Sequence, residues 1–475
     1  MLLYPPGEVY QRGEDRCQMN VSSSVANSLR ACNDLGYISS VLKKENYGIF
    51  LKDYAGEKLS FNDFANDFKR ENPDVVVISA TTGSIYEDIN FANEIKSLKN
   101  DIVIILKGAL FFNPPEKLLD QLNLSNIDYL IGGEVEFIIK DLLNSHFYNK
   151  ENLEKIEGIT YLKNGQRITN KVIRFEEDLD KLPFPDRTIM NNKLYKNPLT
   201  NKPMATISAS RGCSAHCIYC LSPIISGTKV RYRSPQSVVD EMVECVEKHG
   251  ITDFFFKSDT FTINKDWVLN LCDLIINSKL SGKINWVANS RANTIDDEIL
   301  SKMKQAGCSV IAIGLESGSE DSLLKMKKGT TVEINKKAVE LIKKHGIKTF
   351  GFYLIGFPWE DNEHLEETKK FIFKADTDFI EIHLLVPYAG CELQKMINNK
   401  NVHILGEDAC KYHSNGTDYL TSKELEAFKR SVTLRYYLRP KYIAKKLLDA
   451  DMTPSLFLNY IKYGIKMLKN LLFNK

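Results

Sequence analysis

The chain has 475 residues, of which 43% are hydrophobic and 26% are charged, and its formal net charge is +2. This length exceeds what one hydrophobic core usually serves, so we expect two or three domains. The small net charge argues against nucleic-acid binding, and no apolar run reaches the roughly 18 residues that a membrane-spanning helix needs. The first residues do not resemble a secretory signal, so a cytoplasmic location is expected.

The first 150 residues alternate between short apolar runs and amphipathic segments. Strands are expected at Val75–Ser79, Ile102–Leu106 and Tyr129–Ile131, because short β-branched runs are typical of strands buried in a parallel sheet. Helices are expected over 86–98 and from about 134 to 143. This alternation predicts a doubly wound, Rossmann-like α/β domain over residues 1–150.

Residues 151–200 have a different character. Residues 158–165 are predicted to form a hairpin, and the proline-containing residues 182–187 are predicted to form an extended linker. We therefore expect a domain boundary here.

The strand–helix alternation resumes over residues 201–395 with a longer period. Six strands are expected at Met204–Ser208, Asp253–Lys257, Ile284–Ala288, Val310–Leu315, Thr349–Leu354 and Phe379–Leu385. Helices are expected between them at Pro235–His249, Lys265–Ser278, Asp296–Gln305, Val332–His345 and Asn362–Ala375. Six such units predict a partial (β/α)6 barrel with active groups at the carboxyl ends of its strands. Residues 396–475 are expected to be a helical, increasingly basic C-terminal region.

Three of the ten cysteines, Cys213, Cys217 and Cys220, lie within eight residues, just after the first expected barrel strand. Three thiolates on one short loop can bind three irons of a cubane cluster and leave the fourth iron open to another ligand. A zinc loop completed by His216 or a distant histidine, and three incidental buried cysteines, remain as alternatives. The other cysteines are scattered singly, which is typical of a reduced protein rather than of a disulfide framework.

The spacing Cys-x-x-x-Cys-x-x-Cys resembles the signature of the radical S-adenosylmethionine (SAM) superfamily. The resemblance implies a [4Fe–4S] cluster on the three cysteines, whose open iron binds SAM, and reductive cleavage of SAM to a 5′-deoxyadenosyl radical. It places Tyr219 beside the adenine and Asp259 near the methionine amine, although Ser258 stands where relatives often have a second aspartate. The remaining implied SAM-pocket residues are Arg291, Gly314, Glu316, Gly356 and Pro358. For Arg291 and Glu316 a purely structural ion pair is the alternative.

A doubly wound domain before such a barrel resembles the cobalamin-binding subclass of this superfamily. The match includes the segments 4–6, 35–42, 53–54 and 133–136. It implies that cobalamin binds at the carboxyl edge of the first sheet, near Thr82, Ser84, Gly108, Leu110, Gly132, Gly133 and Glu134. The usual Asp-x-His-x-x-Gly motif is missing, and Leu110 stands near the place of the cobalt-binding histidine. A degenerate sheet that binds no cobalamin is therefore the alternative.

The resemblance favours a cobalamin-dependent radical SAM enzyme that methylates an unactivated carbon. An oxidative cyclase or rearrangement enzyme with both cofactors is the alternative, and a non-catalytic cobalamin sensor is a third possibility. A methylthiotransferase is less well supported, because only Cys17 and Cys32 precede the cluster motif.

The expected partners are a small-molecule or lipid-like substrate and an electron donor such as flavodoxin or ferredoxin. The lysine-rich, apolar segment 456–473 predicts either peripheral membrane contact or a helix packed on the barrel.

Overall fold

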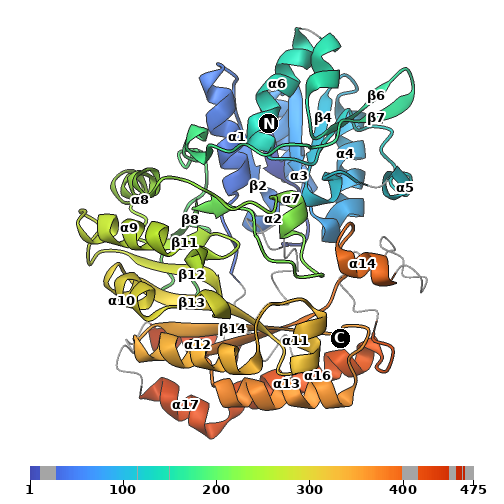
Figure 1. Ribbon diagram of the computed structural model, residues 1–475. Coiled ribbons are helices and arrows are strands. Elements are labelled where there is room, and N and C mark those ends of the chain that lie inside the picture. Colours follow the sequence, from blue (N-terminus) through green and yellow to red (C-terminus); the bar gives the residue numbers. More distant parts are fainter. Residues whose placement is uncertain are drawn as a thin grey trace.

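The computed structural model describes residues 1–10, 28–114, 116–148, 150–397, 416–448, 456–462 and 464–465. These residues form two large sheets, one above the other in Figure 1 and each with helices packed against it, and one two-stranded sheet. The predicted α/β fold class is confirmed, with an amino-terminal doubly wound sheet followed by a six-stranded parallel barrel sheet. Cys17, Cys410 and most of the basic end of the chain lie outside the described residues.

The amino-terminal sheet has the order β2-β1-β3-β4-β5-β6-β7. Its parallel strands are β1 (Leu2–Tyr4), β2 (Leu51–Asp53), β3 (Val75–Ser79), β4 (Val103–Lys107) and β5 (Tyr129–Ile131). The order β2-β1-β3-β4-β5 reverses the direction of winding between β1 and β3, and such a switch point is where open α/β sheets bind ligands. The sheet therefore offers a cofactor site at the carboxyl ends of β1 and β3.

Helices cover both faces of this sheet because successive strand residues point to opposite sides. Val77 of β3 packs in one core with α1 (Asn33–Lys44) and α6 (Val135–Phe147). Val76 and Ile78 pack in the other core with α3 (Phe61–Glu71) and α4 (Ile85–Leu98). Two short helices, α2 (Tyr54–Glu57) and α5 (Glu116–Leu119), also belong to this part of the chain.

The predicted hairpin consists of β6 (Ile159–Lys163) and β7 (Gln166–Thr169), and it belongs to the amino-terminal sheet. Strand β6 pairs antiparallel with β5, so Tyr161 lies opposite Tyr129. The hairpin thus extends the doubly wound sheet beyond residue 150, and the chain then runs to the barrel through the segment 170–203.

The barrel sheet has the order β15-β14-β13-β12-β11-β8, and all of its neighbouring strands are parallel. Its strands are β8 (Met204–Ser208), β11 (Asp253–Lys257), β12 (Asn285–Arg291), β13 (Cys308–Glu316), β14 (Lys348–Ile355) and β15 (Phe379–Leu384). The helices on its outer face are α8 (Pro235–His249), α9 (Lys265–Ile276), α10 (Asp297–Gln305), α12 (Val332–Lys344), α13 (Asn362–Ala375) and α16 (Ser422–Leu438). Among the described strands β8 and β15 do not pair with each other, so the barrel is open, as predicted.

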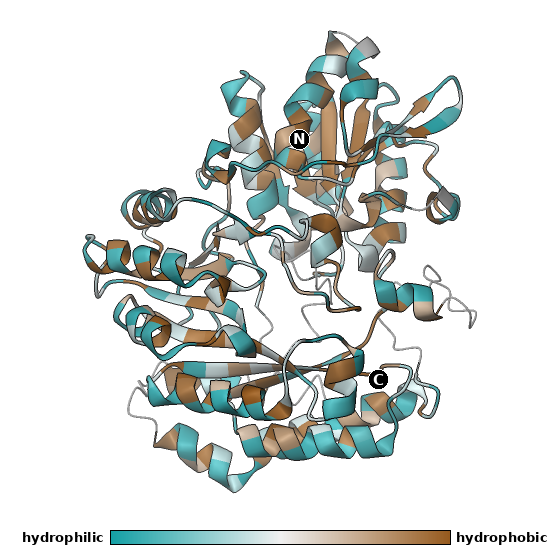
Figure 2. Cartoon of the chain, in the orientation of Figure 1, coloured by the Kyte–Doolittle hydropathy of each residue, from teal (hydrophilic) through white to brown (hydrophobic). Residues whose placement is uncertain are grey.

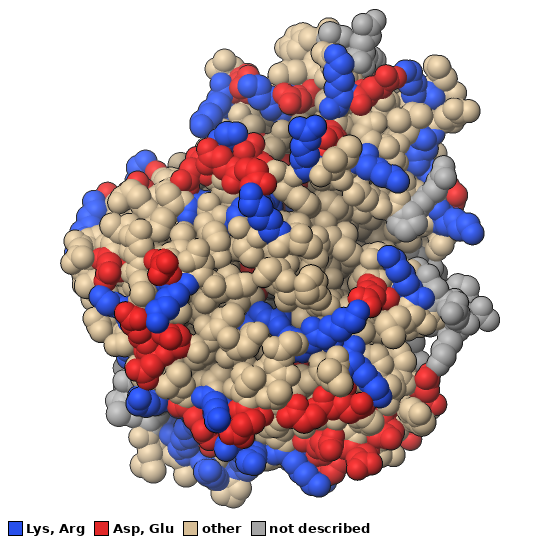
Figure 3. All heavy atoms as spheres, viewed as in Figure 1, with Lys and Arg blue, Asp and Glu red and all other residues tan. Residues whose placement is uncertain are grey.

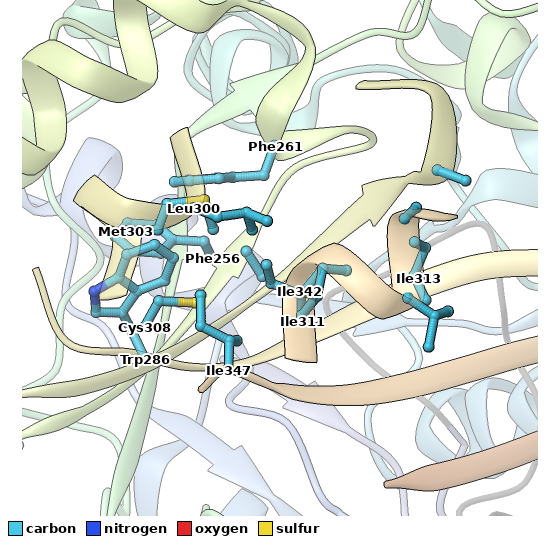
Figure 4. Close-up of a cluster of buried hydrophobic side chains, with 14 of the residues drawn as sticks. Phe256, Phe261, Trp286, Leu300, Met303, Cys308, Ile311, Ile313, Ile342 and Ile347 are labelled. Carbon is cyan, nitrogen blue, oxygen red and sulfur yellow. The ribbon is translucent and has the colours of Figure 1, made fainter. Parts of the chain in front are cut away.

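The barrel core lies between the sheet and these outer helices. Figure 4 shows Phe256 and Trp286 of the sheet meeting Leu300 and Met303 of α10. Figure 2 shows the same division along each outer helix, with an apolar side toward the sheet and a polar side toward solvent. Helix α8 begins and ends at favourable capping residues, because Ser234 accepts a hydrogen bond from the Ser237 N–H and Gly250 ends it at φ 64°.

The last helical segments pack near the amino-terminal ends of the two edge strands of the barrel. After α16 comes α17 (Pro440–Leu447), and residues 456–462 form a further helical segment. The Asn459 side chain donates a hydrogen bond to the Leu199 carbonyl before β8 (3.1 Å), and the Tyr460 ring lies 6.2 Å from that of Phe379 in β15. This segment therefore connects the two open edges of the barrel. None of the helices in the described ranges is both long and apolar enough to cross a membrane.

Candidate active site

The three clustered cysteines lie on a loop whose base is closed by a short antiparallel pair. Strand β9 (Ser210–Arg211) follows β8 directly and pairs with β10 (Arg231–Tyr232), so the cysteines and α7 (Ser222–Ile225) lie between them. Gly212 begins the loop at φ 93°, and a Cβ there would lie 2.2 Å from the Lys229 carbonyl oxygen. Only glycine fits this close approach.

The environment of the cysteines suits thiolates. Cys213 and Cys217 are buried and Cys220 is half-buried. The Arg291 guanidinium donates a hydrogen bond to the Cys217 sulfur (3.3 Å), and the Ser222 N–H donates to the Cys220 sulfur (3.4 Å). A cation and an N–H donor both stabilise the charged form that binds iron.

A single-zinc site finds no support in this geometry. His216 is exposed to solvent. Within the described residues, no three His, Cys, Asp or Glu side chains gather closely enough to hold one metal ion. Thiolates that each bind a different iron of a cubane do not have to converge on one point, so a cluster is compatible with this arrangement.

Beside the cysteine loop, the ends of β12 and β13 bring several predicted SAM-pocket residues together. Arg291, the last residue of β12, also donates to the Lys328 carbonyl, and the Lys328 ammonium forms an ion pair with Glu316 (2.6 Å). The same ammonium lies 3.5 Å from the Tyr219 hydroxyl. A Cβ on Gly314 would lie 2.6 Å from the Glu316 carboxylate, so the glycine makes room for this ion pair.

Glu316 has an unusual backbone conformation at the end of β13. Its φ is 60°, in the left-handed region that non-glycine residues rarely adopt. Such conformations cluster at ligand-binding sites, where the surrounding contacts hold them in place. Lys328, which provides one such contact, was not predicted from the sequence, because nothing in its local pattern separates it from neighbouring Lys325 and Lys327.

The predicted residues Gly356 and Pro358 follow β14 in a turn held by a buried carboxylate. Glu360 accepts hydrogen bonds from the Gly356 N–H (2.7 Å) and the Phe357 N–H (3.1 Å), and burial raises its pKa. The Phe357 ring meets that of Tyr219 edge to face at 5.7 Å. The turn thus packs against the cysteine loop, and Glu360 is a second residue that the sequence interpretation missed.

Asp259 lies on another side of the site. It is half-buried, two residues beyond the end of β11. The preceding Ser258 is buried and forms a hydrogen bond with the Ser210 hydroxyl of β9. Ser258 therefore helps to fix the base of the cysteine loop rather than replacing the expected carboxylate.

At the amino-terminal sheet, a cavity of about 120 Å³ opens at the switch point between β1 and β3. Its lining includes Tyr4 from β1, Ser79 from β3, and Ser84 and Asp88 near the start of α4. The Ser84 hydroxyl donates to the Asp88 carboxylate (2.7 Å). The cavity therefore has hydroxyl and carboxylate groups on one side, as a site for a polar cofactor requires.

A charged network lies beside this cavity. Asp34, at the start of α1, forms an ion pair with Lys107 at the end of β4 and accepts hydrogen bonds from Tyr4 and Ser79. Burial alone would raise its pKa, but the Lys107 ammonium and the hydrogen bonds from Ser79 and the Leu35 N–H lower the pKa of Asp34 to about 2. The carboxyl ends of β1, β3 and β4 are thus joined by one anion.

The other predicted cobalamin residues line the same edge, and part of their role is packing. A Cβ on Gly132 would lie 1.7 Å from the Phe111 carbonyl oxygen, and one on Gly108 would lie 2.7 Å from the Ala80 carbonyl oxygen. Leu110 is 8% exposed and packs in the core of the α3 and α4 side. The remaining predicted residues at this edge are Thr82, just after β3, and Gly133, next to Gly132.

Glu134 connects the cysteine loop to the amino-terminal sheet. It accepts two hydrogen bonds from Arg231 (both 2.9 Å) and one from Arg211 (3.0 Å), and Arg211 also bonds to Glu136. Burial would raise the pKa of Glu134, but the two arginines lower it. Because Arg211 precedes Cys213 by two residues, the cysteine loop is tied directly to the carboxyl edge of the amino-terminal sheet.

Sequence comparisons place the barrel in a known superfamily. The model of the radical SAM superfamily matches residues 207–372. An uncharacterized methyltransferase from Pyrococcus horikoshii is 30% identical over 421 residues, which are 87% of this chain and 89% of that protein. An anaerobic magnesium-protoporphyrin IX monomethyl ester cyclase from Cereibacter sphaeroides is 26% identical over 362 residues, which are 74% of this chain and 58% of that protein.

Solved structures share the whole architecture. The radical SAM methyltransferase TsrM from Kitasatospora setae, with cobalamin and a [4Fe–4S] cluster bound, has a TM-score of 0.70 at 16% identity and covers 98% of both chains. The cobalamin-dependent SAM radical enzyme OxsB has a TM-score of 0.70 at 17% identity, over 94% of this chain and 71% of that one. At these identities the likeness shows the fold. This protein therefore belongs to the radical SAM superfamily of enzymes, which use SAM and a [4Fe–4S] cluster, and it has the two-domain fold of the cobalamin-dependent members.

Proposed function

We propose that this protein is a cobalamin-dependent radical SAM methyltransferase that methylates an unactivated carbon of a small organic substrate. The observation that carries the proposal is the contact of Glu134 with Arg211 and Arg231. It joins the loop of the three cysteines to the edge of the sheet where an open α/β domain binds its ligand. Two cofactor sites that share one interface suit a reaction that uses both cofactors on one substrate.

When bound, the cluster supplies the electron that cleaves SAM to a 5′-deoxyadenosyl radical, and cobalamin carries a methyl group from a second SAM to the substrate. In this proposal Cys213, Cys217 and Cys220 hold the cluster, and a flavodoxin or ferredoxin reduces it. Arg291 keeps a positive charge beside the Cys217 sulfur, which favours the thiolate.

The SAM pocket is proposed to lie between the cysteine loop and the ends of β12, β13 and β14. Tyr219, held against Phe357, offers an aromatic face to the adenine. The Glu316–Lys328 ion pair and Asp259 offer charges to the amino and carboxylate groups of SAM. Gly314 and Gly356 let the main chain approach the ligand, and Pro358 fixes the turn that follows.

The cobalamin site is proposed to lie at the switch point of the amino-terminal sheet, next to the cavity beside Ser84. Thr82, Gly108, Gly132 and Gly133 would form its wall. Leu110, near the place where relatives have a cobalt-binding histidine, is an apolar residue that packs in the core, so in this proposal it would not bind the metal. An apolar neighbour excludes water from that side of the site.

A cyclase or rearrangement enzyme is the second candidate. It is favoured by the 26% identity to the anaerobic cyclase of Cereibacter sphaeroides, a protein that acts on magnesium-protoporphyrin IX monomethyl ester. The two reactions differ in the fate of SAM, because the proposed methyltransferase forms both 5′-deoxyadenosine and S-adenosylhomocysteine, whereas a cyclase forms 5′-deoxyadenosine without S-adenosylhomocysteine. Product analysis therefore separates them.

The test uses anaerobically purified protein loaded with cobalamin, together with a reductant and SAM. We expect the wild type to contain iron and sulfide in the proportion of a [4Fe–4S] cluster and to form 5′-deoxyadenosine. The Cys217→Ala variant should contain no cluster and form no 5′-deoxyadenosine. Cys272→Ala is the matched control, because Cys272 is buried in α9 and burial raises its pKa to about 12. Wild-type protein that forms no 5′-deoxyadenosine would contradict the enzymatic proposal, and one that forms no S-adenosylhomocysteine would favour the cyclase.

The test of the cobalamin site compares two tryptophan variants of one helix. Ser84→Trp fills the cavity before α4, whereas Ser97→Trp places the same ring on the exposed opposite end of α4. We expect the first to bind cobalamin at least tenfold more weakly in equilibrium dialysis and the second to bind normally. Equal affinities in two folded variants would place the cofactor elsewhere.

A further inference from the structure

Helix α17 is oriented against the usual rule for a surface helix. It buries the charged Lys446, which is 7% exposed, and leaves Ile443 and Leu447 44% and 55% exposed. Leu448, directly after the helix, is 83% exposed. A helix that only covers a core turns its apolar side inward. The exposed apolar side of α17 therefore indicates that it binds a partner.

The orientation of α17 is fixed by specific contacts. The Lys446 ammonium forms an ion pair with Asp378 (3.2 Å) and lies 4.6 Å from the Phe379 ring centre at the start of β15. On the same side of the helix, the Tyr442 hydroxyl donates to the Asp378 carbonyl (2.9 Å). Turning the helix to bury its leucines would leave the Asp378 carboxylate without this buried cation. The apolar side therefore stays exposed.

The helical segment 456–462 adds to the same kind of surface. Its Asn459 and Tyr460 face the barrel, whereas Leu458 and Ile461 are 64% and 44% exposed. Across the described residues, about half of all exposed large hydrophobic side chains fall between positions 438 and 465. We call Ile443, Leu447, Leu448, Leu458 and Ile461, with the exposed lysines Lys441, Lys445 and Lys462, the C-terminal face.

Positive charge accompanies this apolar surface. Four cations near α17 form ion pairs with two carboxylates, namely Arg439, Lys441, Lys445 and Lys446 with Asp376 and Asp378. A fifth, Lys343, donates to the main-chain carbonyl of Asp376. Burial, and then repulsion from Lys445, lower the pKa of Lys343, as expected where cations are in excess. Figure 3 shows a group of Lys and Arg side chains at the lower left of the molecule, where α17 lies in Figure 1, and Asp and Glu side chains along the lower edge to their right.

We propose that the C-terminal face binds the surface of an anionic lipid membrane. Exposed leucines and isoleucines flanked by lysines are the features with which a helix lies in a membrane interface, where the apolar side chains enter the headgroup region and the lysines meet lipid phosphates. A second copy of this chain is a poorer partner, because a twofold contact would bring two positively charged faces together. The face lies at the end of the barrel away from the cysteine loop, so binding leaves the active site uncovered.

The experiment is flotation of the purified full-length protein with vesicles of phosphatidylcholine alone or with added phosphatidylglycerol. We expect binding only to the anionic vesicles, and weaker binding as salt is raised. Leu447→Glu should weaken binding at least tenfold because it brings a carboxylate to the headgroups. Lys441→Gln and Lys445→Gln should each weaken binding about fivefold, the effect of one lysine near an anionic surface.

The control is Ile173→Glu, because Ile173 is 77% exposed but lies in the segment between hairpin and barrel. It should bind vesicles like the wild type, and all variants should cleave SAM at the wild-type rate. Wild-type protein that binds neither vesicle at low salt would overturn the proposal, as would Leu447→Glu protein that still binds normally. A wild-type dimer that Leu447→Glu converts to a monomer would instead show that the face binds a second copy.

Discussion

Arg231 and Glu134 join the barrel to the amino-terminal sheet, and a double-mutant cycle measures what their contact contributes. The Arg231 side chain is 2% exposed and makes two parallel hydrogen bonds to the carboxylate, both 2.9 Å long. Removing one partner of a buried ion pair costs about 3–5 kcal/mol when the other is left alone. Arg231 also donates to the Glu176 and Ser226 carbonyls, so the lower end of that range applies.

We therefore expect Glu134→Gln and Arg231→Met each to lower the free energy of unfolding by about 3 kcal/mol. The double variant should lose about 4 kcal/mol, which gives a coupling energy of about 2 kcal/mol. Urea unfolding of the cofactor-free protein at pH 7, with the cysteines kept reduced, measures all four values. Lys229 and Glu177 provide the matched control, because they also form an ion pair close by but are 74% and 64% exposed.

The control pair should show no measurable coupling, since exposed ion pairs contribute little. A coupling energy below about 0.5 kcal/mol for Arg231 and Glu134 would refute the reasoning. It would show that this contact contributes little to holding the two sheets together, and the contact would then no longer support a shared cofactor interface.

Three further results follow from the geometry. Gly132→Ala should destabilise the protein by about 3 kcal/mol in urea unfolding, because its Cβ would overlap a carbonyl oxygen, whereas Gly48→Ala, with nothing within 4 Å, should be neutral. The pKa of Asp34 is about 2 in the folded protein against an ordinary 3.8. Its carboxylate should therefore contribute about 2 kcal/mol to the free energy of unfolding above pH 4, and this contribution should be lost as the pH falls to 2. Asp34→Asn should remove this pH dependence, and a variant whose stability still changes with pH like that of the wild type would contradict the interpretation. Glu316→Gln should weaken SAM binding about tenfold in equilibrium dialysis, since it removes the charge that pairs with Lys328 next to the proposed pocket; unaltered affinity would assign the pair a structural role.

Long periodic segments could be predicted from the sequence. The limits of β8, β11, α8 and α13 agree with the expected ones residue for residue, because each is an apolar or amphipathic run with polar, glycine or proline residues at or next to its ends. Strand β12 ends three residues later than expected, because its last residues, 289–291, are polar. Polar residues at the carboxyl end of a barrel strand interrupt the apolar pattern because they serve the site.

Short elements and distant contacts could not be predicted. Strands β1 and β2 have three residues each, too few for a periodic pattern, and β9 and β10 have two. The partners Glu134 and Arg231 are 97 residues apart, and Arg291 reaches Cys217 over 74 residues. The family resemblance placed most of these residues at the site, but only the folded chain shows which carboxylate meets which arginine. The individual cofactor contacts remain predictions.

The contacts of Asn459 and Tyr460 have a consequence for how the protein is made. They join the start of the barrel, at Leu199, to its last strand, at Phe379, from a segment some 260 residues further along the chain than Leu199. During synthesis at about 5–20 residues per second, the ribosome would release both edges of the barrel well before the segment that connects them. The nascent barrel would therefore expose two unpaired strand edges for seconds. During this interval a chaperone that covers the edges would prevent most aggregation.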